Sequence, residues 1–328
     1  MSKTYQIVGI GNAVVDVLTT CDDSFLAHMG IEKGIMQLIE RDRAETLFAA
    51  MLERQQISGG SVANTVAGCG SAGLSTAFIG RVKDDALGVF YAQDMANDGS
   101  AFVNAPVPGG DLPTSRCMIF VTPDGERSMN TYLGISTDLG PDDVDEAVCA
   151  GAEILFLEGY LFDKPPGKAA FEKAARAIRK GGGKGGIALS DPFCVTRHRD
   201  DFKRLVAEEL DFVIGNSHEF EALYQTDLEA ALAEAAAVCA LVVCTRSGDD
   251  VVILSGGERI EVPVHSVTPV DATGAGDQFA AGFLSGLAQG RDLVTSGKMG
   301  CIAAAEVISH MGARPELPLK QMFARAGV

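Results

Sequence analysis

Short apolar runs alternate with helix-like stretches along most of the chain, and this alternation constrains the fold more than any other feature. The runs are rich in Val, Ile, Leu and Phe, as is typical of buried parallel strands. They are YQIVGIG (5–11), AFIG (77–80), ILFLEG (154–159), GIALSD (186–191), FVIGN (212–216) and LVVCT (241–245). The stretches with helical patterning are Arg41–Arg54, Ser61–Ala72, Asp84–Asn97, Pro165–Lys180, Asp200–Leu210, Ser217–Tyr224 and Leu228–Val238. Strands and helices in alternation predict an α/β fold.

Two segments depart from the alternation. Residues 101–133 carry strand-like sequence on both sides of a Pro-Asp-Gly turn, which indicates an antiparallel hairpin. The run GIMQLI (34–39) is also strand-like and follows no helical pattern. We interpret these pieces as a small β lid formed by discontinuous segments near 13–39 and 101–133. Because no Pro-rich or Ser-rich linker divides the chain, and GGGKGG (181–186) is most simply a flexible helix-to-strand loop, we expect residues 1–328 to form a single domain.

Composition excludes several classes of protein. The 27 Lys and Arg residues against 44 Asp and Glu give a net charge of −17, so we expect no nucleic-acid partner. None of the eight cysteines lies in a CxxC pair, so we expect reduced core residues rather than disulfides or zinc ligands. The sequence shows neither a signal-peptide pattern nor an apolar window of membrane-spanning length. We therefore expect a cytoplasmic protein with no membrane partner.

Glycine is abundant, with 38 residues, and glycine-rich turns are the first lead to chemistry. Two common phosphate-binding motifs are excluded. Gly9 and Gly11 follow a strand, but a dinucleotide-binding fingerprint needs a third glycine where Val14 stands. Lys184 is followed by Gly185 instead of the Ser or Thr of a P-loop.

A stronger candidate is VDATGAGDQFAAGFLSGLAQG (270–290), in which a glycine-rich turn opens onto an apolar helix. The N-terminus of a helix exposes unpaired N–H groups and the positive end of the helix dipole, so this turn suits a phosphate. Asp277 lies at that helix start, where an acid also occurs for purely structural reasons.

DATGAGD within this segment resembles the second signature of the ribokinase-like, or PfkB, carbohydrate kinases. GGSVANTVAGCGSAGLSTAFIGRVKDDALG (59–88) resembles their first signature, about 200 residues earlier. Lys83 stands where many members have glycine, which affects only that turn. With GNAVVD, NSHE and TRSGDD, the resemblance spans nearly the whole chain. It implies an ATP-dependent kinase with a three-layer α/β/α domain, a mostly parallel central sheet and a small β-sheet lid.

The resemblance implies that Asp277 is the general base for the acceptor hydroxyl. It also implies that the backbone N–H groups of Gly274, Ala275 and Gly276 form an anion hole for the transferring phosphoryl group. Phosphoryl transfer has a loose transition state, so catalysis consists mainly of positioning and charge stabilisation. A carboxylate is a weak base, but it can accept the hydroxyl proton late in such a reaction.

For the acceptor, the resemblance implies that Asp16 binds hydroxyl groups, with Asn12 beside it. A carboxylate can accept hydrogen bonds from two neighbouring hydroxyls. Gly59 and Gly60 would let the chain pass close to the sugar, and Asn64 would hydrogen-bond it. Without the resemblance, Asn12 reads as a turn residue, Asp16 as an exposed strand acid and the two glycines as an ordinary helix-start turn.

The remaining motifs concern the nucleotide and metal ions. The implied ATP contacts are Asn216, Thr245, Ser247 and Gly248. Asn216 and Glu219 would bind magnesium through water, which suits an ion that keeps several waters. As an alternative, NSHE is simply a capped helix start. Asp271 and Thr273 would help to place a monovalent cation, potassium in some relatives.

The acceptor is predicted from the detailed sequence of several segments. GNAVVDVL, GIMQLI, GERSMNTYLGIS and LSDPFCVTRHR resemble the adenosine kinase branch more than ribokinase or fructokinase. A nucleoside needs an apolar site for its base. The side chains that could line such a site, or else be core, are Met36, Leu38, Met118, Phe120 and Tyr160. We expect phosphorylation of the ribose 5′-hydroxyl of adenosine. The alternatives are a sugar kinase of the same family and a non-catalytic nucleoside- or sugar-binding regulator. Both a monomer and a lid-mediated dimer are compatible with the sequence.

Overall fold

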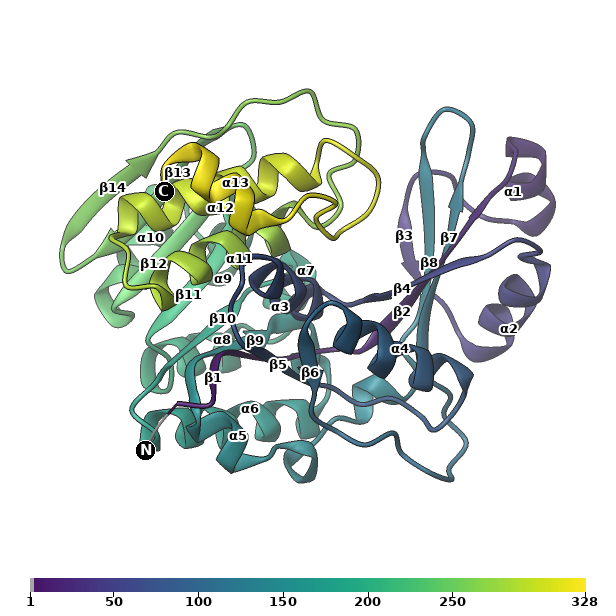
Figure 1. Ribbon diagram of the computed structural model, residues 1–328, viewed down its shortest axis with the longest axis horizontal. Coiled ribbons are helices and arrows are strands. Elements are labelled where there is room, and N and C mark those ends of the chain that lie inside the picture. The colour runs from purple at the N-terminus through teal and green to yellow at the C-terminus, as the bar shows by residue number, and fades with distance from the viewer. Residues whose placement is uncertain (1–2) are drawn as a thin grey trace.

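The computed structural model describes residues 3–328, which build one large and one small sheet (Figure 1). From edge to edge, the large sheet contains β14 (Glu258–Val262), β13 (Asp249–Ser255), β12 (Leu241–Arg246), β11 (Phe212–Asn216), β10 (Lys184–Ala188), β9 (Ala152–Glu158), β1 (Tyr5–Ile10), β5 (Thr76–Ile79) and β6 (Ser100–Phe102). The pairs from β12 to β6 are parallel, and β13 and β14 are added by antiparallel pairing. The predicted mostly parallel sheet is confirmed.

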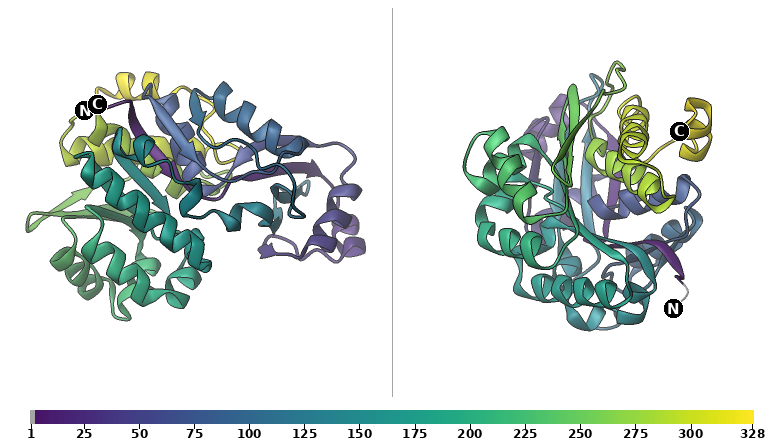
Figure 2. Two further views of the ribbon diagram at one scale, coloured as in Figure 1. Left: turned by 90° about the horizontal axis from the view of Figure 1, so that it is seen from below. Right: turned by 90° about the vertical axis from the view of Figure 1, so that its left-hand side faces the viewer.

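Helices cover both faces of the large sheet, which gives the three predicted layers (Figure 2). Neighbouring residues of β1 and of β9 pack into different cores, one on each face of the sheet. Val8 and Leu155 are buried on one face, and Ile7 and Phe156 on the other. The first face is covered by α5 (Glu146–Ala150), α6 (Pro165–Lys180), α7 (Pro192–Arg197), α8 (Arg199–Glu208), α9 (Ser217–Tyr224) and α10 (Leu228–Val238). The second carries α3 (Ser61–Ser71), α4 (Ala86–Asn97), α11 (Ala275–Ala288) and α12 (Leu293–Val307), with α13 (Leu319–Ala326) outside them. Short 3₁₀ turns are η1 (Gly134–Asp138), η2 (Pro141–Asp143) and η3 (Gly159–Asp163).

The small sheet contains, in spatial order, β3 (Met36–Leu38), β8 (Arg127–Tyr132), β7 (Ser115–Val121), β2 (Val14–Thr20) and β4 (Gln55–Gly59). As predicted, β7 and β8 form an antiparallel hairpin. The helices α1 (Asp23–Met29) and α2 (Arg41–Ala50) pack on one face, where Val15, Val17 and Phe120 are buried. Alternation along β2 turns Val14 and Asp16 to the other face, toward the large sheet. That this sheet closes as a lid, and that the chain is a single domain, stay predictions.

Several boundaries differ from the sequence prediction. Residues 101–102 belong to β6 of the large sheet, not to the small one. The helix predicted to reach Arg54 ends at Ala50 and is followed by β4, whose sequence QQISG lacks a clear apolar pattern. The GGGKGG segment is only partly a loop, because residues 184–186 form the start of β10. Glycine is needed there, since a Cβ at Gly186 would overlap the buried Phe212 ring.

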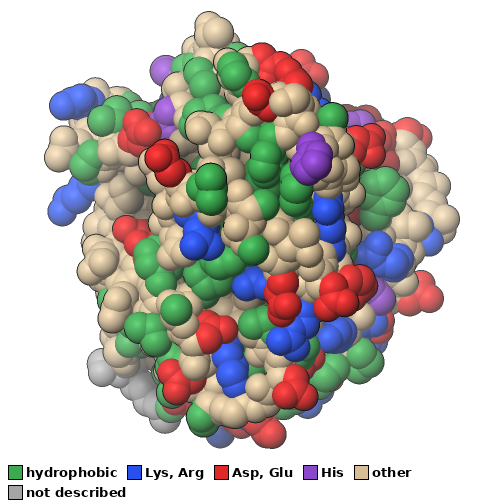
Figure 3. All heavy atoms as spheres, turned by 90° about the vertical axis from the view of Figure 1, so that its right-hand side faces the viewer, with side chains coloured by type: hydrophobic (Ala, Val, Ile, Leu, Met, Phe, Trp, Pro, Cys, Tyr) green, Lys and Arg blue, Asp and Glu red, His purple; other side chains and the backbone are tan. Residues whose placement is uncertain are grey.

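The cysteines are as expected from the sequence, and the surface carries charges of both signs. All eight cysteines are free thiols, and seven are buried. On the end of the molecule built by the small sheet and its helices, Lys and Arg side chains lie among Asp and Glu (Figure 3). Among residues 3–328, no helix combines the length and apolarity needed to cross a membrane.

Candidate active site

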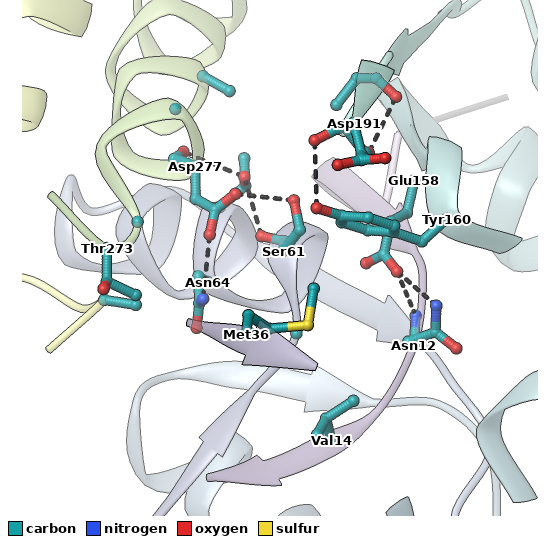
Figure 4. Close-up of a pocket in the computed structure, with 18 of the residues that line it drawn as sticks. Asn12, Val14, Met36, Ser61, Asn64, Glu158, Tyr160, Asp191, Thr273 and Asp277 are labelled. Carbon is teal, nitrogen blue, oxygen red and sulfur yellow. Dashed lines mark hydrogen bonds between the residues drawn. The ribbon is translucent and has the colours of Figure 1, made fainter. Parts of the chain in front are cut away.

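A cavity of about 740 Å³ lies between the two sheets, at the carboxyl ends of β1, β9, β10, β11 and β12. Ligands of open parallel sheets usually bind at this edge. The predicted site residues that line it are Asn12, Asp16, Met36, Gly60, Asn64, Asn216, Glu219, Thr245, Thr273, Gly274, Ala275, Gly276 and Asp277. Gly59, Ser247, Gly248 and Asp271 are not among its lining residues. Figure 4 shows Asp277, Ser61 and Asn64 on one side of the cavity, facing Glu158 and Tyr160 on the other.

Asp277 occupies the first turn of α11 and is held by α3. Its Oδ1 accepts a hydrogen bond from Ser61 Oγ at 2.7 Å, and its Oδ2 accepts one from Asn64 Nδ2 at 3.1 Å. Burial raises the pKa of Asp277 to about 6, although these two hydrogen bonds act in the opposite direction. The carboxylate is therefore largely ionised at neutral pH and is a stronger base than an exposed aspartate.

Gly59 and Gly60 connect β4 to α3 beside the acceptor-binding aspartate predicted from the sequence. A Cβ at Gly59 would lie 2.6 Å from Asp16 Oδ2, so only glycine leaves room for that carboxylate. Gly60 has φ +105°, and a Cβ there would overlap the backbone oxygen of Asn12. Gly60 is thus required by the backbone and Gly59 by the Asp16 side chain, and their place beside Asp16 is consistent with the predicted close approach to a ligand.

The carboxylate of Asp16 points into the cavity from the small sheet. Among residues 3–328, no group donates a hydrogen bond to it. Burial raises the pKa of Asp16 to about 6; the charges of Arg127 and Arg314 lower it and that of Asp277 raises it. A half-buried carboxylate with free lone pairs is available to accept hydrogen bonds from a ligand.

Asn12 is committed to contacts within the protein. Its Nδ2 donates to Glu158 Oε1 at 2.7 Å, and its Oδ1 accepts from Ser136 Oγ at 2.9 Å. Glu158 also accepts from the backbone N–H groups of Asn12 and Val62, at 3.1 and 3.2 Å. Asn12 therefore joins the end of β1 to Glu158, and Glu158 joins both to the start of α3.

Sequence reasoning missed Glu158, which is 1% exposed and lines the cavity. Burial raises the pKa of Glu158 to about 7, against the hydrogen bonds from Asn12 and Val62. The only signal in the sequence was an acid at the end of the apolar run ILFLEG, where buried acids are uncommon without a partner.

The turn before α11 has the geometry of an anion site, with one change from the prediction. Gly274 has φ +77°, and a Cβ there would lie 2.7 Å from Ala313 Cα, so glycine is required. The N–H of Ala275 donates to Ala272 O at 3.2 Å and is already used in the turn. Within residues 3–328, the N–H groups of Gly274 and Gly276 donate to no other protein group, and both residues line the cavity.

Asp271 is fully engaged by the protein. Its Oδ1 accepts from the N–H and the hydroxyl of Thr273, at 3.0 and 2.6 Å, and its Oδ2 accepts from the Gly312 N–H at 3.0 Å. Oδ2 also forms an ion pair with Arg127 of β8, which ties the small sheet to this turn. Burial opposes ionisation, but the hydrogen bonds from Gly312 and Thr273 and the charge of Arg127 together lower the pKa of Asp271. Since Arg127 neutralises this side chain, it does not fit the predicted role of potassium ligand.

On the opposite side of the cavity, Asn216 and Glu219 form a capping box at the start of α9. Asn216 Oδ1 accepts from the Glu219 N–H at 3.0 Å, and the Glu219 carboxylate accepts from the N–H and Nδ2 of Asn216, both at 2.8 Å. Burial raises the pKa of Glu219 to about 7. The structural alternative for NSHE is thus correct as a description of the helix start. Both residues also line the cavity, so the ligand role is compatible with it.

The turn between β12 and β13 contains the other predicted ATP contacts. Thr245 lines the cavity at the end of β12. Ser247 adopts φ +54°, whereas Gly248 has open space at its Cβ position and no left-handed φ. The fold therefore does not require glycine at position 248.

Residues 34–320 match the sequence pattern described as pfkB family carbohydrate kinase. The chain belongs to the pfkB family. It is a phosphotransferase that acts on an alcohol group of a sugar or nucleoside. The motifs between Gly59 and Asp277 lie within the matched region, whereas the GNAVVD motif with Asn12 and Asp16 precedes it.

Solved structures resemble this pfkB kinase over nearly its whole length. A probable sugar kinase protein from Rhizobium etli CFN 42 is 43% identical, with a TM-score of 0.90 and 99% of each chain covered. An adenosine kinase from Sinorhizobium meliloti is 44% identical, with a TM-score of 0.89 and the same coverage. Among curated proteins, a 5-dehydro-2-deoxygluconokinase from Bacillus licheniformis is 28% identical over 79% of this chain and 83% of its own. The ribokinase-like fold and the kinship with adenosine kinases are confirmed, whereas the relatives' names include both sugar and nucleoside kinases.

Proposed function

We propose that this pfkB kinase transfers the γ-phosphoryl group of ATP to the 5′-hydroxyl of a nucleoside, and that adenosine is the preferred acceptor. The observation that carries the proposal is that one cavity combines an apolar wall with the Asp16 carboxylate, which accepts no hydrogen bond from the described part of the chain. Met36, Leu38 and Phe193 line this cavity and are 52%, 60% and 76% exposed. Apolar side chains left open around a cavity suit a flat base, and the neighbouring carboxylate suits the hydroxyls of its ribose.

The acceptor would be held from the small sheet. Asp16 can accept hydrogen bonds from two adjacent ribose hydroxyls, and Gly59 keeps the space beside it free. In that arrangement the 5′-hydroxyl is directed toward Asp277, on the opposite wall of the cavity. Met36, from the edge strand β3, lines the same cavity and would contact the base (Figure 4).

Transfer would take place at the start of α11. Ser61 and Asn64 hold both oxygens of Asp277, so the carboxylate needs little reorganisation to accept the hydroxyl proton. The N–H groups of Gly274 and Gly276, at the positive end of the α11 dipole, would stabilise charge on the phosphoryl oxygens.

The nucleotide would lie toward Thr245 and Asn216, at the ends of β12 and β11. Magnesium, when bound with ATP, supplies charge neutralisation of the phosphates. Glu219 has lone pairs beyond those used by Asn216, so it fits the role of accepting hydrogen bonds from magnesium-bound water. Potassium has no part in this proposal, because Asp271 is paired with Arg127.

A sugar acceptor is the second candidate. It is favoured by the 5-dehydro-2-deoxygluconokinase relatives and by Glu158, a buried carboxylate in the cavity wall that adds polarity where a sugar would lie. A coupled ADP-release assay over adenosine, other nucleosides, ribose, fructose and sugar acids or phosphates distinguishes the two. Turnover of sugars alone would contradict the nucleoside proposal. Binding of a nucleoside without turnover would instead support the regulator.

A further inference from the structure

Arg314 is a largely buried cation that contacts Asn64, the partner of Asp277, and none of the family motifs quoted above contains it. It lies in the loop after α12, and its side chain is 12% exposed. Its Nη1 forms an ion pair with Asp98, the residue that caps the end of α4, and lies 3.8 Å from Asp94 on α4. Its Nε donates to Asn64 Oδ1 at 3.4 Å. The guanidinium therefore faces two acids on one side and the active-site amide on the other.

Each contact between Arg314 and Asp277 joins a hydrogen-bond donor to an acceptor. A guanidinium can only donate hydrogen bonds, and an ionised carboxylate can only accept them. Asn64 lies between them, with Oδ1 toward Arg314 and Nδ2 toward Asp277. Arg314 thus selects the amide orientation in which Asn64 donates to Asp277. Without that donor, the amide could rotate and present an oxygen to the carboxylate.

A second set of contacts links Arg314 to the acceptor side. Asp94 Oδ2, held near Arg314, accepts from the N–H and hydroxyl of Ser58 at 2.8 and 2.6 Å. Ser58 precedes Gly59, the residue that makes room for the Asp16 carboxylate. The charge of Arg314 also favours the ionised form of Asp16.

The loop that carries Arg314 also contacts the segment proposed to bind the phosphoryl group. The Gly312 N–H donates to Asp271 Oδ2 at 3.0 Å, and Ala313 O accepts from Gln278 Nε2 at 3.0 Å. Residues 312–314 therefore contact the turn before α11, α11 itself and α3 within three consecutive positions. A displacement of this loop would move both the anion site and Asn64.

We propose that Arg314 is a positioning residue for phosphoryl transfer, which acts through Asn64 on Asp277 and through the α4 contacts and its own charge on Asp16. This inference rests on the roles proposed above for Asp277 and Asp16. Other charged or titratable groups face these side chains. Around the two aspartates they are Arg127, Glu158, Tyr160, Cys117 and Tyr91, and behind Arg314 they are Asp94 and Asp98.

The kinetic test compares Arg314→Met and Arg314→Lys on whichever acceptor the wild-type protein phosphorylates. Arg314→Met should lower kcat by about tenfold to a hundredfold, the loss typical of a misplaced reacting group, raise the acceptor KM and leave the ATP KM unchanged. Arg314→Lys keeps the charge near Asp16 but lacks the Nε donor, so it should restore the acceptor KM but not kcat. Arg325→Met, an exposed arginine on α13, is the matched control and should change neither.

Wild-type kcat and KM in folded Arg314→Met would overturn the proposal. If that variant does not fold, Arg314→Lys decides, because wild-type kcat there would show that the contact with Asn64 is dispensable. Equal losses for the acceptor and ATP would indicate a merely structural role and would also count against it.

A second measurement needs no turnover. Carboxyl-carbon NMR of aspartate-labelled protein follows the titration of Asp277, with its signal assigned from Asp277→Asn. Loss of Arg314 should move the midpoint to higher pH, and an unchanged midpoint would overturn the inference. If Asp277→Asn kept wild-type kcat, the proposed function of Asp277 would fail, while this titration would still decide whether Arg314 controls its charge.

Discussion

Replacing Asp16 with Asn tests how the acceptor is held. The variant keeps the shape of the side chain and one acceptor oxygen, but turns the other oxygen into a donor and removes the charge. Within residues 3–328 no group donates a hydrogen bond to this carboxylate, so the hydrogen bonds lost in the variant are those of the ligand. One hydrogen bond to a charged group contributes about 1.5 to 3 kcal/mol, so kcat/KM for the acceptor should fall by about 10- to 150-fold.

The assay is coupled ADP release at saturating ATP, with adenosine and its 2′-deoxy and 3′-deoxy analogues. Wild-type protein should discriminate strongly against both analogues, and Asp16→Asn should discriminate less, because it has lost the partner of one hydroxyl. Asp42→Asn, an exposed acid on α2, is the control for removal of a negative charge from the same end of the molecule. Unchanged kcat/KM and unchanged discrimination in Asp16→Asn would refute the assignment.

Five further predictions concern the cavity and the small sheet. Asp277→Asn should lower kcat by orders of magnitude with little change in acceptor KM, and near-normal turnover would contradict its role as base. Gly60→Ala should lower the Tm and abolish acceptor binding measured by calorimetry, because φ +105° and the Asn12 carbonyl exclude a side chain; a wild-type Tm would show that the turn can rearrange. Activity should decrease as pH falls through about 6, since Asp16 and Asp277 then become protonated. The free energy of unfolding should change in the opposite direction: both pKa values are raised from 3.8 on folding, so the folded state binds more protons between pH 4 and 6 and loses stability as pH rises through this window, as denaturant titrations would reveal. Hydrogen exchange in residues 101–133 should slow when acceptor and ATP analogue are both bound, and equal exchange would argue against a closing lid.

The sequence predicted the fold well where local pattern decides it. Buried strands such as FVIGN and LVVCT are continuous apolar runs, and parallel strands covered on both faces require that pattern. Strand β4 was missed, because its sequence QQISG has little apolar character and is placed by pairing with β2. Pairing between distant segments is not visible in a local window.

For the site, motif residues were predicted and their supporting contacts were not. Asp277, Gly274 and Gly60 belong to motifs whose spacing is local. The positions of Glu158 and Arg314 in the site result from contacts between segments far apart in the chain. Glu158 contacts residues 12 and 62, and Arg314 contacts residues 64 and 98. A lone acid after a strand, or a lone arginine in a loop, carries no sign of such partners.

The loop of residues 312–314 has a consequence for the order in which the site is assembled during synthesis. Within residues 3–328, every other group that forms a hydrogen bond or ion pair with the side chains of Asp277, Asp271 and Asn64 precedes this loop along the chain. A nascent chain that has emerged only as far as α12 contains every strand of both sheets. It lacks the Gly312 N–H that donates to Asp271, the Ala313 carbonyl that accepts from Gln278 and the Arg314 guanidinium that donates to Asn64. The ability to phosphorylate should therefore arise late, after most of the fold is in place. Premature termination just before Gly312 should give a protein that is nearly complete in mass but poorly ordered at the phosphoryl-transfer site.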